Sequence, residues 1–398
     1  MEKIKVIHIS HASVSVYMKG QKTLKQMILD DWYSLTAQQI KKYYPEIDIE
    51  CWTPEKSFKI PQEFFENGIK YRQFPTLFSP MYGLDFSIKM LKEMKKEILS
   101  AKENRYKVVF HLHEYHNLHG LLIASLFKGE KIIGQHHGGS WPLKHLVESK
   151  KKKYFFLFFL WGQIWENIVL RNIDYFYALS KDEINYLKQV APKSKIKFQT
   201  MGIEEYYFKE VDKKMARKKL AWEVDKKIVL YLGRLIPVKG LDYLLRAMKK
   251  IPEVELKVIG WGDEKFYKNY AKNLGLKNVE FVGPIFYEKK LSYLSASDVF
   301  VLPSIKEGAP VSLMEAMAMN VPSVVTDVGG TTLMIKNGEN GVIVDRNVDS
   351  IIMGIKKVLK WTKKDIRKYA EKYKWEEVVR ESVKDYKSLF FLTKLTKS

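Results

Sequence analysis

Short apolar segments alternate with amphipathic segments along almost the whole chain. The apolar segments are typical of strands buried in a sheet, and the segments between them have the period of helices. In the first half the expected strands lie near residues 5–10, 47–52, 69–74, 107–113, 131–136, 175–179 and 195–199. In the second half they lie near 228–232, 255–259, 279–282, 299–302, 323–326 and 342–344, and helical patterns include 241–250, 264–274 and 288–296. This alternation predicts parallel sheets covered by helices on both faces.

The chain is long for a single hydrophobic core. It has 398 residues, 46% of them apolar, and a charged stretch at 213–219 interrupts the strand signals between residues 200 and 227. Chains of this length usually divide into two domains. We therefore expect an α/β protein of two doubly wound parallel-sheet domains, in which ligands bind at the carboxyl ends of the strands.

Two carboxylates flank the expected strand-to-helix turn after residue 302. Glu307 lies on the loop, and Glu315 lies about a turn and a half into the helix, which we expect to begin at Pro310. The backbone N–H groups of Val311 and Ser312 would point out of this helix start, where an anion is stabilised. The turn is therefore suited to a phosphorylated ligand that carries hydroxyl groups.

A second loop, at 233–240, adds cations to the same sheet edge. Arg234 and Lys239 lie between two glycines directly after the strand at 228–232. Their charges are suited to a diphosphate. The next strand ends in Gly260 and Gly262, which would let a planar base approach the backbone, although ordinary turn glycines explain them equally well.

Taken together, these motifs resemble the donor half of the family 4 glycosyltransferases. The residues that carry the resemblance are Gly233, Arg234, Lys239, Gly240, the Gly260-Trp261-Gly262 turn, Glu307 to Glu315, and Asp327 to Gly330. The resemblance covers about residues 229–344. It implies the GT-B fold, with two Rossmann-like domains facing across a cleft, and a retaining, metal-independent transfer. The implied domains are an acceptor-side domain at 1–205, a nucleotide-sugar donor domain at 206–375, and a final segment at 376–398 that crosses back onto the first.

The resemblance also implies roles for individual residues. Arg234 and Lys239 would bind the donor diphosphate, Glu315 the ribose, and Glu307 the transferred sugar or the positive charge that develops at its ring. His137 would be the active-site histidine, with His136 as the alternative. The catalytic residues implied are His137, Glu307, Arg234 and Lys239. The donor-binding residues implied are Gly233, Arg234, Lys239, Gly260, Gly262, Val282, Glu307, Gly308, Ala309, Val311, Ser312 and Glu315.

The sequence departs from the family pattern within the turn after Glu307. Pro310 stands where a glycine is more usual and has no N–H to donate, and Ala309 is small where an aromatic residue is common. Binding of the sugar would therefore depend more on Glu307 and on the neighbouring N–H groups.

All nine histidines lie at or before His145. Four of them, at positions 111, 113, 116 and 119, surround Glu114 and resemble a metal cluster. The first two fall on an expected strand and the others on the turn and helix after it, so that one ion could not easily bind all four. We expect no metal site there. No Asp-x-Asp motif for a divalent ion stands out either, and we expect no cofactor besides the nucleotide-sugar substrate.

The net charge of +22 calls for an acidic partner. No nucleic-acid binding module is recognisable, and we expect no nucleic-acid partner. Lys150–Lys153 precedes eight large apolar residues that end at Trp161. The apolar block is too short to span a bilayer, so the segment from Lys150 to Trp161 is interpreted either as an anchor on an anionic membrane surface or as a buried helix with solvated lysines.

The function expected is transfer of a sugar from a nucleoside diphosphate sugar, a UDP-sugar before GDP-mannose, to a lipid-linked or cell-surface glycan. The chain shows no signal-peptide pattern at its start, and we expect a cytoplasmic enzyme, with peripheral attachment to the inner face of the cell membrane if the anchor interpretation holds. The alternatives are a nucleotide-sugar epimerase, a sugar phosphorylase, or a non-enzymatic protein that binds sugar nucleotides or membranes.

Overall fold

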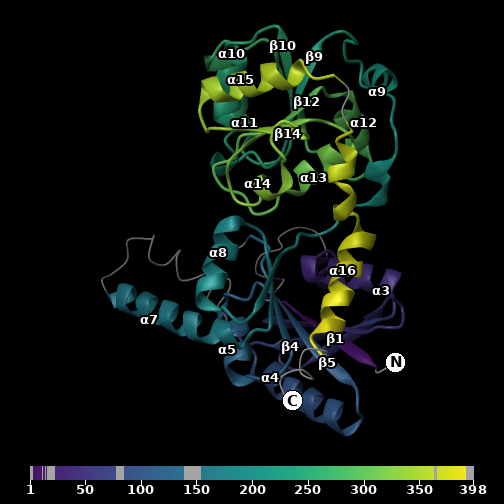
Figure 1. Ribbon diagram of the computed structural model, residues 1–398, viewed down its shortest axis with the longest axis vertical. Coiled ribbons are helices and arrows are strands. Elements are labelled where there is room, and N and C mark those ends of the chain that lie inside the picture. Colours follow the sequence, from purple (N-terminus) through teal and green to yellow (C-terminus); the bar gives the residue numbers. More distant parts are fainter. Residues whose placement is uncertain are drawn as a thin grey trace. The chain divides into compact units, whose positions relative to one another are not determined.

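The computed structural model describes residues 3–77, apart from 11, 14 and 16–22, together with 85–138, 154–362 and 365–390. The chain forms two compact units. The N-terminal unit comprises residues 1–201 and 378–398, and the C-terminal unit comprises 202–377. Each unit is built around one sheet with helices on both faces (Figure 1).

The N-terminal unit contains an eight-stranded sheet in the order β3-β4-β2-β1-β5-β6-β7-β8. Only β3 is antiparallel to its neighbour. The strands are β1 (Ile4–Ile9), β2 (Asp48–Glu55), β3 (Gln62–Glu66), β4 (Ile69–Pro75), β5 (Lys107–His113), β6 (Ile132–Gln135), β7 (Tyr175–Ala178) and β8 (Lys195–Phe198). The prediction missed β3, because this edge strand is mostly exposed and reads as a polar segment.

Helices cover both faces of this sheet. The helices of this unit among the described residues are α2 (Leu24–Leu29), α3 (Trp32–Tyr43), α4 (Ile88–Glu103), α5 (Leu118–Leu126), α7 (Tyr154–Val169), α8 (Lys181–Val190) and the C-terminal part of α16 (Trp375–Ser388). On one face, α4, α5 and α8 bury an apolar cluster against β1 and β5. On the other face the neighbours of the sheet are more polar, since the Tyr386 hydroxyl of α16 bonds with His111 of β5.

The C-terminal unit contains a six-stranded, fully parallel sheet in the order β11-β10-β9-β12-β13-β14. Its strands are β9 (Lys227–Leu232), β10 (Val254–Ile259), β11 (Val279–Gly283), β12 (Val299–Leu302), β13 (Ser323–Thr326) and β14 (Gly341–Val344). Its helices are α9 (Lys213–Lys219), α10 (Leu241–Lys249), α11 (Glu264–Asn273), α12 (Lys289–Ala296), α13 (Val311–Ala318), α14 (Thr331–Met334) and α15 (Val348–Leu359). The strand order reverses between β9 and β12, and ligands of such sheets bind outside the carboxyl ends of the strands at this point.

The predicted fold class is confirmed: both sheets are doubly wound and have the Rossmann arrangement. Every predicted strand is present, with ends that shift by a few residues. The apolar pattern was a reliable guide because the central strands are buried on both faces, as in β9, where five of six residues are buried.

Two glycines let the loops at the carboxyl edge of the C-terminal sheet pack tightly. Gly240 has φ +66°, and a Cβ atom there would lie 2.0 Å from the carbonyl oxygen of Pro303. Gly260 has φ +159°, and a Cβ atom there would lie 1.8 Å from the carbonyl oxygen of Gly233. Contact between neighbouring loops is therefore enough to require glycine at both positions, whatever ligand binds nearby.

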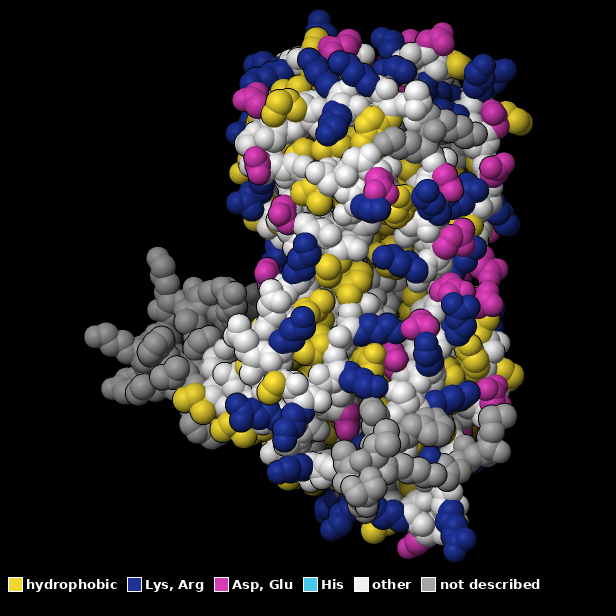
Figure 2. All heavy atoms as spheres, in the orientation of Figure 1, with side chains coloured by type: hydrophobic (Ala, Val, Ile, Leu, Met, Phe, Trp, Pro, Cys, Tyr) yellow, Lys and Arg dark blue, Asp and Glu magenta, His cyan; other side chains and the backbone are white. Residues whose placement is uncertain are grey.

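Lysine and arginine side chains are spread widely over the face drawn in Figure 2, in keeping with the net charge of +22. Among the described helices, none is both long enough and apolar enough to cross a membrane. Residues 150–153 of the basic and aromatic segment lie outside the described residues. The backbone of 154–161 belongs to α7, but the side chains of these residues are not described.

Candidate functional site

An ion pair joins two loops of the C-terminal unit at the point where its strand order reverses. Lys239 follows β9, and its Nζ donates to both carboxylate oxygens of Glu307, which follows β12, at 2.7 Å each. The Ser304 hydroxyl donates to Glu307 Oε1 at 2.6 Å. The Glu307 side chain is 5% exposed and that of Lys239 is 16% exposed. The two loops predicted to bind a ligand are thus joined by Lys239 and Glu307, the same charged residues that are expected to contact that ligand.

Arg234 lies on the same loop as Lys239 and is exposed. Its guanidinium makes no hydrogen bond or ion pair with the residues that the structure describes, whereas its carbonyl oxygen accepts a hydrogen bond from the Tyr231 hydroxyl at 2.8 Å. The backbone of Arg234 is therefore fixed while its cationic group can still bind a ligand.

The amino end of α13 provides N–H groups beside this pair. The helix begins at Val311, and Pro310 is its N-cap in an extended conformation, with ψ 117°. The prediction that Pro310 is the first helical residue was wrong by one position, because its backbone has not yet turned into the helix. The amides of Val311 and Ser312 make no hydrogen bond with the described residues, as expected for the first turn of a helix.

Glu315 lies further along α13 and is buried, with 5% of its surface exposed. Its Oε1 accepts hydrogen bonds from the Tyr207 hydroxyl at 2.8 Å and from Lys290 Nζ. Neither Tyr207 nor Lys290 was among the residues singled out from the sequence. Tyr207 lies in a short 3-10 turn and Lys290 at the start of α12, so both are outside the glycine-rich loops. Neither residue belongs to a local sequence motif from which its role could be predicted.

The remaining predicted donor-binding residues lie on the same loops and strand ends. Gly233 follows β9, Gly260 and Gly262 follow β10, and Val282 is at the end of β11, where it is partly buried. Gly308 and Ala309 lie between Glu307 and α13, and the Gly308 carbonyl accepts the Gly330 amide at 2.6 Å. These residues all lie at or just after the carboxyl ends of strands, which is the edge where a ligand is expected.

His137 follows β6 in the N-terminal unit and is half-buried. Its Nε2 lies 2.7 Å from Nδ1 of His113, and Nε2 of His113 lies 2.9 Å from Nδ1 of His8. The backbone N–H of His137 donates to Glu114 Oε1 at 2.8 Å. His136, the alternative, points elsewhere: its Nδ1 lies 3.1 Å from Glu183 Oε2. His137 is thus the end of a chain of three histidines.

The four histidines that surround Glu114 in the sequence do not form one group. His111 and His113 lie on β5 beside His8 of β1, and these three could approach one ion. His116 forms a separate group of that kind with Glu114 and His136. His119 belongs to neither of these groups. His111 and His113 are alternate residues of β5 and therefore point to the same face of the sheet. His119 lies on the following helix, α5, which places it in the core.

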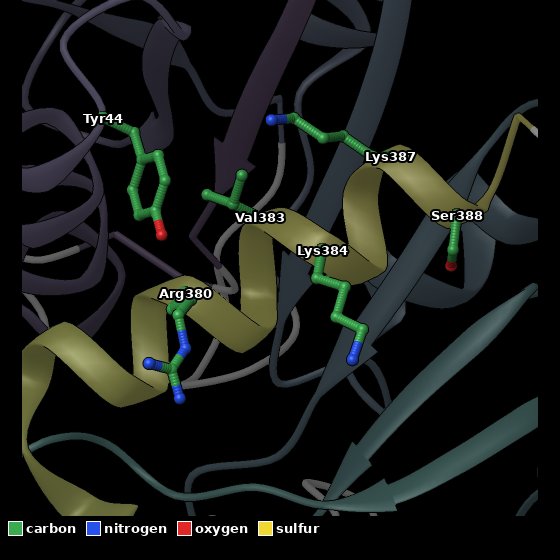
Figure 3. Close-up of a pocket in the computed structure, with 6 residues that line it drawn as sticks. All are labelled: Tyr44, Arg380, Val383, Lys384, Lys387 and Ser388. Atoms are coloured by element: carbon green, nitrogen blue, oxygen red, sulfur yellow. The ribbon is translucent and has the colours of Figure 1, made fainter.

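A pocket lined by three cationic side chains lies on the surface of the N-terminal unit. This pocket of about 390 Å³ lies between the end of α3 and α16, and its lining residues are Tyr44, Arg380, Val383, Lys384, Lys387 and Ser388. The three cationic side chains point in different directions (Figure 3). A compact anion could not contact all of them at once in this arrangement.

The C-terminal unit is similar to a known family of enzymes. Residues 212–374 match the family model of the glycosyl transferases, group 1. This match covers the loops that carry Arg234, Lys239 and Glu307, and the helix α13 that carries Glu315. It supports a group 1 glycosyltransferase, a coarser class than the family 4 resemblance.

Two similar proteins of Methanocaldococcus jannaschii are described as uncharacterized glycosyltransferases. The first is 34% identical over 216 residues, which are 49% of this chain and 55% of that protein. The second is 27% identical over 293 residues, 68% of this chain and 71% of that protein. The chain thus spans about half the length of the first relative and somewhat more of the second.

Solved glycosyltransferase structures share the fold of the whole chain. Sucrose-phosphate synthase of Thermosynechococcus elongatus is 19% identical, has a TM-score of 0.69 and matches 98% of this chain and 100% of its own. The galactosyltransferase WaaB of the lipopolysaccharide outer core has a TM-score of 0.64 at 18% identity, matching 98% of this chain and 99% of its own. At such identities the likeness shows the fold alone, which is the GT-B fold of two Rossmann-like domains.

The buried histidines predict that acid destabilises the protein. Burial lowers the pKa of His119 to about 4, whereas the unfolded chain would titrate near 6.5. Between these values the unfolded state binds a proton that the folded state does not, so stability is lost as the pH falls from 6.5 towards 4. At pH 5 the loss from this one group is about 2 kcal/mol. The variant His119→Leu should therefore lose less stability than the wild type between pH 7.5 and 5, as measured by urea unfolding.

His116→Gln is the matched control for this prediction. Nδ1 of His116 lies 3.5 Å from Glu166 Oε1 and its side chain is 17% exposed. Its replacement leaves His119 in place, so the loss of stability attributed to His119 should remain. Equal pH dependence in His119→Leu and the wild type would contradict the account.

Proposed function

We propose that the protein transfers a sugar from a nucleoside diphosphate sugar to a hydroxyl group of an acceptor glycan. The observation that carries this proposal is the group of charges at the strand reversal of the C-terminal sheet, within the segment that matches the family model. There Lys239 is paired with Glu307, while the Arg234 guanidinium and the first two N–H groups of α13 make no hydrogen bond with any residue that the structure describes. The arrangement offers cations and backbone donors to a diphosphate.

The chemistry of transfer requires this kind of site. The bond between the anomeric carbon and the diphosphate oxygen breaks, and its electrons remain on the phosphate. The acceptor oxygen forms the new bond to the anomeric carbon and loses its proton, which the departing diphosphate can accept. Positive charge develops on the sugar and negative charge on the departing phosphates. Arg234, Lys239 and the start of α13 would stabilise the phosphates, and Glu307 would contact hydroxyls of the sugar or its positive charge.

The finer features of the proposal rest on the resemblance of the motifs to family 4. These are retention of the anomeric configuration, the role of Glu315 as the ribose ligand, and the role of His137 in the active site. For the donor, a UDP-sugar is our first choice and GDP-mannose the second. HepE of Anabaena, which has been solved in complex with UDP, shares the fold with a TM-score of 0.65 at 16% identity and matches 96% of this chain and 100% of its own.

We further propose that the acceptor is lipid-linked or part of a cell-surface glycan, and that the N-terminal unit contacts an anionic membrane surface. Ile164 and Ile168 lie one turn apart on α7 and are 53% and 59% exposed, and Leu126 of the neighbouring α5 is 62% exposed. Four lysines precede α7 in the sequence. Exposed aliphatic residues on a helix that follows a basic cluster suit binding at the level of anionic headgroups.

Replacing Lys239 tests the diphosphate assignment. Lys239→Ala should lower kcat by about 10²- to 10³-fold, since a well-placed charged donor contributes about 2.7 to 4 kcal/mol to the transition state. The measurement is release of nucleoside diphosphate in the presence of donor and acceptor. Lys249→Ala, at an exposed lysine of α10, is the matched control and should keep full activity. A near-normal rate in Lys239→Ala, with the fold verified by circular dichroism, would contradict the assignment.

We also expect the transfer to need no metal ion, because Arg234 and Lys239 supply the positive charge that a divalent ion provides in other sites. The same assay, run after treatment with EDTA, should give an unchanged rate. A rate that falls in EDTA and recovers with added Mg²⁺ would overturn this expectation.

The membrane proposal predicts that charge on the exposed face of α7 weakens binding to vesicles. The double variant Ile164→Asp and Ile168→Asp should sediment several-fold less with phosphatidylglycerol vesicles than the wild type, because carboxylates are repelled by the headgroups. Met353→Asp, at a methionine of α15 that is 65% exposed, is the control and should sediment normally. Wild-type protein that does not sediment, or a double variant that sediments fully, would refute the proposal.

A further inference from the structure

Three separate elements of the C-terminal unit converge on the carboxylate of Glu315. Tyr207 comes from the 3-10 turn Glu205–Phe208, Lys290 from the first turn of α12, and Glu315 from the second turn of α13. The Tyr207 hydroxyl and Lys290 Nζ both donate to the same atom, Glu315 Oε1. Lys290 Nζ also lies 5.4 Å from the centre of the Tyr207 ring, within the range of a cation–π contact. The three side chains therefore hold one another.

The second carboxylate oxygen is in a different situation. Glu315 Oε2 makes no hydrogen bond with any residue that the structure describes. It is also not among the buried polar atoms that are sealed from solvent without a partner. The residue as a whole is only 5% exposed. One oxygen is thus anchored inside the unit, while the other keeps access to the outside.

Both anchoring residues present hydrogen-bond donors to the carboxylate. Burial raises the pKa of Tyr207 well above its ordinary value, and the neighbouring Glu315 carboxylate raises it further. Tyr207 therefore keeps its proton and remains a donor. Lys290 supplies a positive charge next to a carboxylate that would otherwise be costly to bury.

We propose that Tyr207 and Lys290 are positioning residues, which fix Oε1 of Glu315 so that Oε2 accepts a hydrogen bond from a ribose hydroxyl. As a consequence, the site binds ribonucleotides more tightly than dideoxyribonucleotides. The inference rests on the proposed function, because it takes Glu315 as the ribose ligand. It adds two residues that the family motif does not contain and assigns the selectivity to the geometry of one carboxylate.

The physical reason for selectivity is the fixed position of the acceptor atom. A carboxylate held at Oε1 cannot rotate to find another partner when a ligand lacks the hydroxyl, and Oε2 then loses water without gaining a hydrogen bond. Hydrogen bonds to charged groups contribute enough that the wild type should bind the ribonucleotide about 10-fold more tightly, or more. If the carboxylate were free to rotate, the protein would lose much of its preference for the ribonucleotide.

The test compares the binding of UDP and 2′,3′-dideoxy-UDP by isothermal titration calorimetry, with GDP and its dideoxy form as the second pair. The wild type should prefer the ribonucleotide. In Tyr207→Phe and Lys290→Met this preference should fall at least about threefold, since each variant removes one of the two anchors. Lys290→Arg, which keeps a charged donor, should retain most of the preference. Lys289→Met, at the neighbouring exposed lysine, is the matched control and should match the wild type.

The outcomes separate this inference from the function on which it rests. If the wild type binds none of the four nucleotides, the proposed function fails and the inference fails with it. If the wild type binds ribo and dideoxy forms equally, the ribose role of Glu315 and the positioning role are both overturned, while the proposed sugar transfer stands. If both variants keep the full wild-type preference, the positioning role alone is overturned. A merely structural role would lower the melting temperature and the affinity for both forms alike, and would leave their ratio unchanged.

Discussion

The ion pair between Lys239 and Glu307 is the interaction on which the candidate site depends. It joins the loops after β9 and β12, the two strands between which the sheet order reverses. A buried ion pair stabilises a fold only when its geometry is good and its remaining hydrogen-bonding capacity is satisfied. Here both carboxylate oxygens lie 2.7 Å from the amine, and the Ser304 hydroxyl provides a further donor. The close packing of Gly240 under the Pro303 carbonyl brings the two loops near enough for this contact.

Under the proposed function, the pair would determine how the diphosphate enters the site. Lys239 and Lys290 are each engaged with a glutamate, whereas Arg234 is unengaged among the described residues. An incoming diphosphate would first meet Arg234 and the open start of α13, and would then compete with Glu307 for Lys239. Glu307 would in turn be released towards the hydroxyls of the sugar. In the ligand-free site, Lys239 and Lys290 are therefore paired with Glu307 and Glu315, so these buried charges are not left without a partner.

The sequence was sufficient to predict the fold class and the loops of the site, but not the contacts within them. The strands were recognisable because most are apolar on both faces, and β3 was missed because its side chains are mostly exposed. Arg234, Lys239 and Glu307 could be placed at one edge, since carboxyl ends of parallel strands meet there. That Lys239 and Glu307 would bond to each other could not be predicted, because spacing along the chain does not fix the direction of a side chain in a loop. Tyr207 and Lys290 are 108 and 25 residues from Glu315, and only tertiary structure brings them together.

The histidines of the N-terminal unit show the same limit. Their spacing in the sequence groups positions 111 to 119, whereas strand pairing brings His8 beside His111 and His113. The grouping of histidines therefore depends on how β1 and β5 pair. The sequence of neither strand alone specifies this pairing.

The most direct test of the account is a crystal structure of the protein with UDP or GDP bound. The account predicts that the diphosphate lies at the start of α13, within hydrogen-bonding distance of Arg234 and Lys239, and that the contact between Lys239 and Glu307 is lengthened or broken. A nucleotide bound elsewhere, or one bound at this edge with neither cation in contact with its phosphates, would contradict it.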